Sequence, residues 1–193
     1  MKPYYETPLG KLYHGDCLEI MPDLEPVDLV LTDPPYPEFN EDHGKSWVQT
    51  PLENITLPCV QQFIFWPCTR KFPFDYTAKH IWHKPNGQSN EHYEEIYERF
   101  GKRVCRVFRI PIINYKTLPE WQPHPSQKPL RLIFDLLLLT KSKSIIDPFL
   151  GSGTTAVACE RLKRQWIGIE IEEKYCEIAA KRIEAERRQL KLF

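Results

Sequence analysis

Long apolar runs, closely paired cysteines and an excess of charge of one sign are all missing from this sequence of 193 residues. The longest apolar runs, Leu136–Leu139 among them, are far shorter than the roughly 18 residues that a membrane span requires. The N-terminal residues contain no apolar stretch of the kind found in a secretion signal. We therefore expect no membrane association, and a cytoplasmic protein of a bacterial cell or of a viral host.

The six cysteines include no CxxC pair, which is the usual spacing of redox and zinc motifs. We expect them to be reduced thiols, as is usual in the cytosol. His80 and His83, together with Cys59 and Cys68, fit no common zinc spacing. A strand over 80–83 would place the two histidines on opposite faces, so no metal site is expected.

Net charge is also absent, since 26 basic residues balance 26 acidic ones. The distribution is uneven: residues 1–60 carry 3 Lys or Arg and 11 Asp or Glu, whereas residues 61–193 carry 23 and 15. A neutral total argues against a protein that binds nucleic acid by charge alone. The asymmetry still allows one basic face.

Proline is absent after Pro148, although the chain contains 18 prolines. The last part of the chain therefore predicts regular structure, and the earlier part predicts strands interrupted by loops. The alternation of elements at the end favours one α/β domain over 1–193, with a single mostly parallel, twisted sheet and helices on both faces. Strands are expected at 12–14, 27–32, 62–66, 80–83, 105–110, 144–147 and 165–170, and helices at 18–21, 130–139, 154–164 and 174–190, while 93–100 is ambiguous between the two.

A glycine-containing segment at 147–156 reads DPFLGSGTTA and joins an expected strand to an expected helix. Glycines at this position let the backbone turn sharply and approach a ligand, and Glu170 at the end of the next strand is placed to bind ribose hydroxyls. The pattern suits NAD, FAD or S-adenosyl-L-methionine. It is not a phosphate-binding P-loop, because no GK[ST] closes it. A plain helix start, with glycines for the turn, is the structural alternative.

A second segment, Asp33-Pro34-Pro35-Tyr36, follows the apolar run 27–32. Two prolines alone would indicate only the end of a strand and a turn. A carboxylate at the carboxyl end of a buried strand is more informative, because open α/β sheets bind ligands at that edge. The carboxylate can accept a hydrogen bond from an amine, and the tyrosine can stack on a planar base.

Together these segments resemble the amino-methyltransferases that modify the exocyclic nitrogen of adenine or cytosine in DNA. Residues 33–36 (DPPY) match the catalytic motif of that family and residues 147–154 (DPFLGSGT) its cofactor loop, while residues 124–129 (HPSQKP) match a third segment. The catalytic motif precedes the cofactor loop, as in the permuted beta group. The resemblance implies a Rossmann-like methyltransferase fold, S-adenosyl-L-methionine as cofactor, DNA as partner, and a restriction–modification setting.

The same resemblance implies roles for individual residues. Asp33 and the Pro34 carbonyl would accept hydrogen bonds from the target amine, and Tyr36 would stack on a base flipped out of the duplex. For Asp16, the structural alternative to cofactor binding is a role as a helix N-cap. For Ser126 and Lys128, the alternative is a position in an ordinary surface loop. The catalytic set is Asp33, Pro34, Pro35 and Tyr36, and the cofactor set is Asp16, Cys17, Asp33, Ser126, Lys128, Asp147, Pro148, Phe149, Gly151, Ser152, Gly153, Thr154, Glu170 and Ile171.

Little chain is left for reading DNA sequence, because only about a dozen residues separate Pro111 from His124. We expect DNA contact from loop insertions at 37–58 and 111–124 and from the basic stretch 61–131, which carries 12 Lys or Arg against 6 Asp or Glu. A homodimer and an unidentified recognition partner remain open. The phosphate-contact candidates, each of which could instead be a solvated surface charge, are Arg70, Lys71, Lys79, Lys84, Arg99, Lys102 and Arg103.

The expected activity is methyl transfer to adenine N6, since the catalytic motif begins with Asp rather than with the Ser common in cytosine-N4 enzymes. Cytosine-N4 methylation stays open, because Asp occurs in both groups. Two further alternatives are a nicotinamide-dependent oxidoreductase and an inactive DNA-binding relative. Only 23 residues follow Glu170, which is too few for the second half of a dinucleotide fold in its usual place.

Overall fold

One mixed sheet organises the protein, whose computed structural model describes residues 1–35, 59–86, 92–112 and 127–190. Within these ranges the strand order is β1-β2-β9-β8-β3-β4-β6-β5-β7. The central strands from β2 to β4 run parallel, whereas β1, at one edge, and β6 are antiparallel to their neighbours. The strands are β1 (Tyr5–Glu6), β2 (Gly10–His14), β3 (Val27–Thr32), β4 (Cys59–Trp66), β5 (Ala78–His83), β6 (Tyr93–Arg99), β7 (Val107–Arg109), β8 (Ser144–Asp147) and β9 (Gln165–Glu170).

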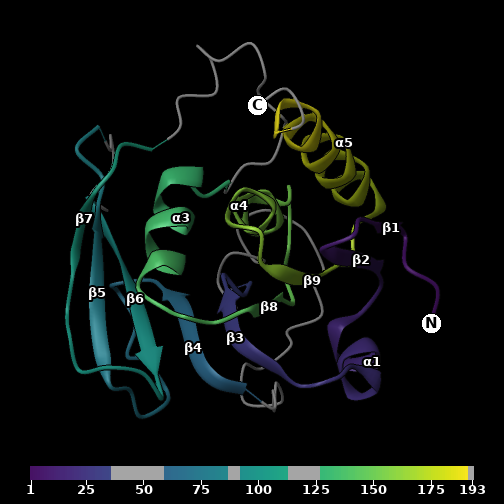
Figure 1. Ribbon diagram of the computed structural model, residues 1–193. Coiled ribbons are helices and arrows are strands. Elements are labelled where there is room, and N and C mark those ends of the chain that lie inside the picture. Colours follow the sequence, from purple (N-terminus) through teal and green to yellow (C-terminus); the bar gives the residue numbers. More distant parts are fainter. Residues whose placement is uncertain (36–58, 87–91, 113–126, 191–193) are drawn as a thin grey trace, which may run out of the picture.

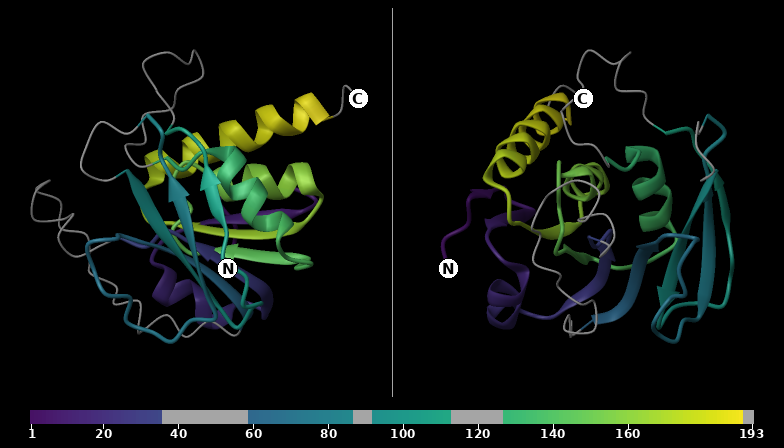
Figure 2. Two further views of the ribbon diagram at one scale, coloured as in Figure 1. Left: turned by 90° about the vertical axis from the view of Figure 1, so that its left-hand side faces the viewer. Right: turned by 180° about the vertical axis from the view of Figure 1, so that it is seen from behind.

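Helices cover both faces of the sheet, as Figures 1 and 2 show. Three helices, α3, α4 and α5, lie side by side on one face, and α1 with the short 3-10 helix η1 lies on the other. No helix among the described residues is long and apolar enough to cross a membrane. The helices are α1 (Cys17–Ile20), η1 (Met21–Asp23), α3 (Leu130–Leu138), α4 (Thr154–Leu162) and α5 (Glu173–Leu190).

The main core lies between the central strands and the three-helix layer. In α3 the buried leucines and isoleucine recur with helical spacing, so one face of this helix is apolar and packs on the sheet. Pro129 precedes its first turn, where a missing N–H costs nothing. Trp166 of β9 packs closely on Gly10 of the neighbouring strand β2. A Cβ on Gly10 would lie 2.2 Å from the indole ring.

The opposite face holds two smaller apolar clusters. Ile20 and Met21 cover Val30 and Ile146 of the central strands. Beyond β4, the ring of Phe72 stacks on Tyr97 of β6 with centroids 4.1 Å apart. These clusters bury both faces of the central strands, which explains why consecutive apolar residues occur in them, as at 29–31 in β3 and 145–146 in β8.

The sheet and its helices confirm the expected fold class, and element boundaries agree with the sequence predictions to within about three residues. The ambiguous segment is strand β6, paired with β4 and β5 on its two sides. Its three glutamates, Glu94, Glu95 and Glu98, obscure the strand pattern in the sequence. Each of them is largely buried and has a polar partner in β5 or just after it. Glu94 and Glu95 form ion pairs with Lys84 and Lys79, and Glu98 is hydrogen-bonded to His80, so tertiary contacts override their low strand propensity. Strand β1 was not predicted, because it is only two residues long.

Several sequence predictions lie outside the described residues. These include the expected loop 37–58, almost all of the segment 111–124, and the individual residues Tyr36 and Ser126.

Candidate active site

Four carboxylates line one edge of the sheet, where the parallel strands end. Asp16 follows β2, Glu170 ends β9, Asp147 ends β8 and Asp33 follows β3. The strand order β2-β9-β8-β3 places these four strand ends next to one another in that sequence. Ligands of open α/β sheets bind at this edge, where the strand order changes direction. The structure therefore brings together residues that lie up to 154 positions apart, Asp16 and Glu170 among them.

The glycine loop between β8 and α4 depends on backbone conformations that L side chains rarely adopt. Gly151 has φ of 55° and Gly153 has φ of 85°. A Cβ on Gly153 would lie 2.9 Å from the Cβ of Ala179 in α5, so a larger residue would also push this helix away. The two glycines thus permit both the tight turn and the close packing of α5 behind it.

Arg182 of α5 fixes this loop from behind, and the sequence reasoning missed it. Its guanidinium donates hydrogen bonds to the carbonyl of Ser152 at 2.5 Å, to the Ser152 hydroxyl at 2.8 Å and to the Thr154 hydroxyl at 3.2 Å. Burial lowers the pKa of Arg182 to about 10, which still leaves it charged at neutral pH. The signal for it in the sequence is an arginine three residues after buried Ala179, on the apolar side of the helix.

Glu170 is buried, and its carboxylate accepts hydrogen bonds from the backbone of the glycine loop and of the segment after β9. One carboxylate oxygen accepts the Gly151 N–H at 2.7 Å and the other accepts the Glu172 N–H at 2.9 Å. Burial raises the pKa of this carboxyl, although both backbone hydrogen bonds oppose the shift. Asp16 caps α1 by accepting the Leu18 N–H at 2.8 Å, so its N-cap role is present in the structure. Its neighbour Cys17 is buried, and burial raises the pKa of that thiol to about 11.

Asp147 is a buried carboxyl of the site with a strongly raised pKa. Its oxygens accept the Thr155 hydroxyl at 2.6 Å and the Phe149 N–H at 3.2 Å. Burial, reinforced by the nearby charges of Asp33 and Glu170, raises its pKa from 3.8 to about 7. The half-buried Phe149 follows it, next to the glycine loop.

The raised pKa of Asp147 predicts a pH-dependent stability. Between about pH 4 and 7 the folded protein keeps a proton that the unfolded chain has released, so the free energy of unfolding should fall as pH rises through this window. The loss should reach roughly 2–4 kcal/mol by pH 8. In the Asp147→Asn variant this part of the slope should disappear. Urea unfolding at pH 5, 6, 7 and 8 measures it, and parallel slopes for the two proteins would contradict the assignment.

Asp33 lies at the end of β3 and forms an ion pair with Lys128, which precedes α3. The exposed fractions of the two side chains are 24% for Asp33 and 12% for Lys128. Burial opposes the charge of Lys128, but Asp33 and Glu94 together hold the pKa of its ammonium above the usual value. Pro34, which follows Asp33, is buried, and Pro35 is partly exposed. The segment 124–129 therefore places Lys128 in contact with Asp33 of the catalytic motif.

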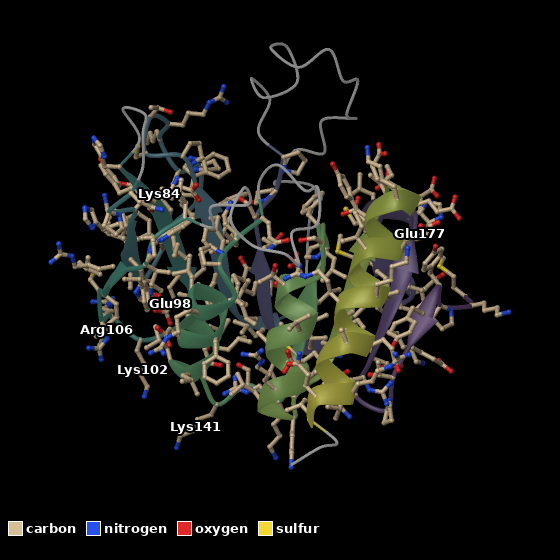
Figure 3. All side chains as sticks on the ribbon, turned by 90° about the horizontal axis from the view of Figure 1, so that it is seen from above. Lys84, Glu98, Lys102, Arg106, Lys141 and Glu177 are labelled. Atoms are coloured by element: carbon tan, nitrogen blue, oxygen red, sulfur yellow. The ribbon has the colours of Figure 1, made fainter. Side chains whose placement is uncertain are left out.

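The basic candidates for DNA contact do not gather at this edge. Arg99 pairs with Gln62 near the start of β4, and Lys102 and Arg103 follow it, so these three lie toward the opposite edge of the sheet. Figure 3 shows the separation, with Lys84 at one end of the sheet and Lys102 at the other. Arg70 and Lys71 follow β4 and so begin on the side of Asp33.

Lys84 is a correction to the sequence-based set. Its side chain is buried, and its ammonium binds Glu94 at 2.6 Å and lies 4.9 Å from the centre of the Trp82 ring. A buried, paired ammonium is not presented to a phosphate, so we withdraw Lys84 as a phosphate contact. Lys79 is more exposed but is paired with Glu95 at 2.9 Å.

Comparison with known proteins gives one matching family model, N6_N4_Mtase, described as DNA methylase, over residues 57–181. Among curated proteins, the type II methyltransferase M2.LlaDCHI of Lactococcus lactis subsp. cremoris is 28% identical over 94% of this chain and 92% of its own length. The type II methyltransferase M2.DpnII of Streptococcus pneumoniae is also 28% identical, over 96% and 93%. The alignment with M2.LlaDCHI spans 250 positions, more than the 193 residues of this chain, so that relative carries segments with no counterpart here.

Solved structures show the same fold. The M1.HpyAVI–SAM complex superposes with a TM-score of 0.66 at 24% identity, covering 91% of this chain and 99% of that one. PvuII DNA methyltransferase, described as cytosine-N4-specific, gives a TM-score of 0.68 at 18% identity, covering 94% and 88%. At these identities the likeness establishes the fold, which is the Rossmann-like methyltransferase arrangement.

Proposed function

Since this chain belongs to the N6_N4_Mtase family of DNA methylases, we propose that it transfers a methyl group from S-adenosyl-L-methionine to the N6 amine of adenine in DNA. The observation that carries the proposal is the position of Asp33-Pro34 beside the glycine loop. Strand β3, which ends at the motif, is the direct neighbour of β8, which ends at the loop. An amine held by Asp33 and a cofactor held by the loop would therefore meet at one sheet edge.

The residues at this edge fit S-adenosyl-L-methionine. After its two backbone bonds, each oxygen of Glu170 retains a lone pair that can accept from a ribose hydroxyl. The positive φ angles of Gly151 and Gly153 let the backbone come close to the bound molecule. We assign Asp16, Phe149 and Glu170 to the nucleoside half of the cofactor and Lys128 to its methionine end. When bound, the cofactor supplies an electrophilic methyl group on a sulfonium.

The residues of the chain would prepare the amine. The lone pair of an exocyclic amine is delocalised into the base, which makes the nitrogen a poor nucleophile. Asp33 and the Pro34 carbonyl would accept hydrogen bonds from the two N–H groups of the amine. These hydrogen bonds would localise the lone pair on the nitrogen. The fixed positions of the two acceptors would also orient the nitrogen toward the methyl group, whose electrophilic character comes from the cofactor. Tyr36, directly after the prolines in sequence, is assigned to stack on the flipped base.

The DNA sequence that this chain recognises should be short and loosely specified. Methylome sequencing after expression of the chain measures both this sequence and the identity of the methylated base. We expect N6-methyladenine in a context of a few base pairs, because direct readout requires contacts worth about 1–3 kcal/mol each and the chain has few residues for them. Phosphate contacts position DNA without reading it, so duplex affinity should fall steeply with salt and differ little between unrelated sequences.

The outcomes of that experiment are distinct. Detection of N4-methylcytosine would change the target base from adenine to cytosine and leave the rest of the proposal in place. A single, fully modified motif of six or more defined bases, made by this chain alone, would show that recognition has been misjudged. A dependence of the motif on a second expressed chain would identify the recognition partner. Association of the chain into a homodimer, and action on cytoplasmic DNA, belong to the same proposal.

A further inference from the structure

Four charged side chains alternate in sign along a line that ends at the catalytic motif. The Lys84 ammonium binds one oxygen of Glu94 at 2.6 Å, and the Lys128 ammonium lies 3.4 Å from the other. Lys128 is also paired with Asp33. The side chains of Lys84 and Glu94 are 10% and 19% exposed, so the line runs largely through the protein interior. The formal charges of the four groups cancel.

The two oxygens of Glu94 are used unequally. Oε1 accepts a hydrogen bond from Lys84, whereas Oε2 is buried and accepts no hydrogen bond from the described residues. Its contact with the Lys128 ammonium, at 3.4 Å, is a long ion pair, so this buried oxygen is only partly compensated in the resting arrangement. Lys128 could shorten this contact, because its ammonium ends a flexible four-carbon side chain and has three donors.

The resting contact of Lys128 competes with the chemistry assigned to Asp33. An amine can donate to Asp33 more readily if the ammonium that already occupies this carboxylate moves aside. A buried ammonium that loses its anion without gaining another is strongly unfavourable. A second anion must therefore stand within reach, and Oε2 of Glu94 does so at 3.4 Å.

We propose that Lys128 has two positions, and that Glu94 is the positioning residue that receives it when the target amine engages Asp33. The inference rests on the proposed function and adds a residue, on the antiparallel strand β6, to the methyl-transfer site. Lys84 holds Glu94 in place through Oε1, and Lys84 itself lies against the Trp82 ring. Lys84 would therefore support the site from within the protein and would not contact DNA.

The movement is a change of position and not of protonation. Burial would raise the pKa of Glu94, but the ammonium groups of Lys128 and Lys84 hold it below its usual value. The pKa of Lys128 lies above its usual value, because Asp33 and Glu94 outweigh the effect of burial. Both groups therefore remain charged across the working pH range, and the proton lost by the amine after attack is not passed along this line.

The test compares Glu94→Gln with Glu95→Gln. Both residues are on β6 and largely buried, and both bind a lysine, but Glu95 faces the other side of the sheet and pairs with Lys79 at 2.9 Å. Glu94→Gln should leave Lys128 on Asp33 and lower the single-turnover rate about 10- to 150-fold, the value of one hydrogen bond to a charged group. Cofactor affinity should stay within about threefold. Glu95→Gln should retain the wild-type rate.

Two further variants separate charge from shape. Glu94→Asp keeps an anion for Lys128 and should stay within about fivefold of the wild-type rate, and thermal unfolding of all variants checks their folding. In a Lys128→Met background, Glu94→Gln should change the residual rate by less than about threefold, because Glu94 acts through Lys128. Equal loss in the Gln variants of Glu94 and Glu95, or additive loss in the double variant, would overturn the inference. A wild-type chain that methylates no DNA would instead overturn the proposed function on which it rests.

Discussion

Replacing Asp33 by alanine should reduce methyl transfer by at least about 10³-fold, with the affinity for S-adenosyl-L-methionine changed by no more than a few fold. The carboxylate lies at the end of β3, beside the glycine loop and outside it, so the variant should remove the acceptor for the amine and leave the cofactor contacts. Single-turnover transfer of a tritiated methyl group measures the first quantity, and titration calorimetry measures the second.

The control for this variant must account for the lost ion pair with Lys128. Asp33→Asn keeps the shape and one acceptor, and should lie between the wild type and the alanine variant in rate. Asp135→Ala breaks another aspartate pair, with Arg131 at 2.8 Å on α3, and should leave transfer unchanged. An Asp33→Ala protein that folds and still transfers methyl groups at the wild-type rate would refute the role of this carboxylate.

Replacing Glu170 by alanine should weaken binding of S-adenosyl-L-methionine by roughly 1.5–3 kcal/mol, or about 10- to 150-fold in the dissociation constant. Two causes combine. The variant removes the acceptor proposed for the ribose, and it frees the N–H of Gly151, which donates to Glu170 at 2.7 Å and helps to fix the glycine loop. Titration calorimetry at pH 7.5 gives the dissociation constant.

The adjacent Glu172 provides a matched comparison. Its backbone N–H donates to Glu170, but its side chain is paired only with Lys174 in the described structure, at 3.6 Å. Glu172→Ala should therefore bind the cofactor as the wild type does. If Glu170→Ala also binds with wild-type affinity, Glu170 has no part in the cofactor site and the glycine loop keeps its shape without it.

The sequence predicts the central sheet well because its strands are short segments rich in apolar residues, and several of them are followed by proline or glycine. Val27–Thr32 and Gln165–Glu170 were placed with the observed bounds. Strand β6 was ambiguous, because its three glutamates are paired through contacts with β5 and with the segments before α3 and after β6, which no local pattern reveals.

The candidate site divides in the same way. Motif residues such as Asp33, Asp147 and Glu170 lie at strand ends, and strand ends can be located from the sequence. Glu94 and Arg182 could not be identified from the sequence, because their roles depend on tertiary contacts with residues that are distant in the sequence. Lys84 was misassigned for the same reason, since a lysine in a basic stretch has no local sign that it will be buried against Glu94.

The position of β8 and β9 between β2 and β3 has a consequence for synthesis of the chain. Both early strands, β2 and β3, leave the ribosome more than 100 residues before the neighbours that separate them. At about 10 residues per second this interval lasts on the order of 10 s, and throughout it the inner edges of β2 and β3 remain open. Such late, long-range pairing slows folding and exposes unpaired strand edges to other nascent chains. The nascent protein thus depends on its last 50 residues to close the middle of its own sheet.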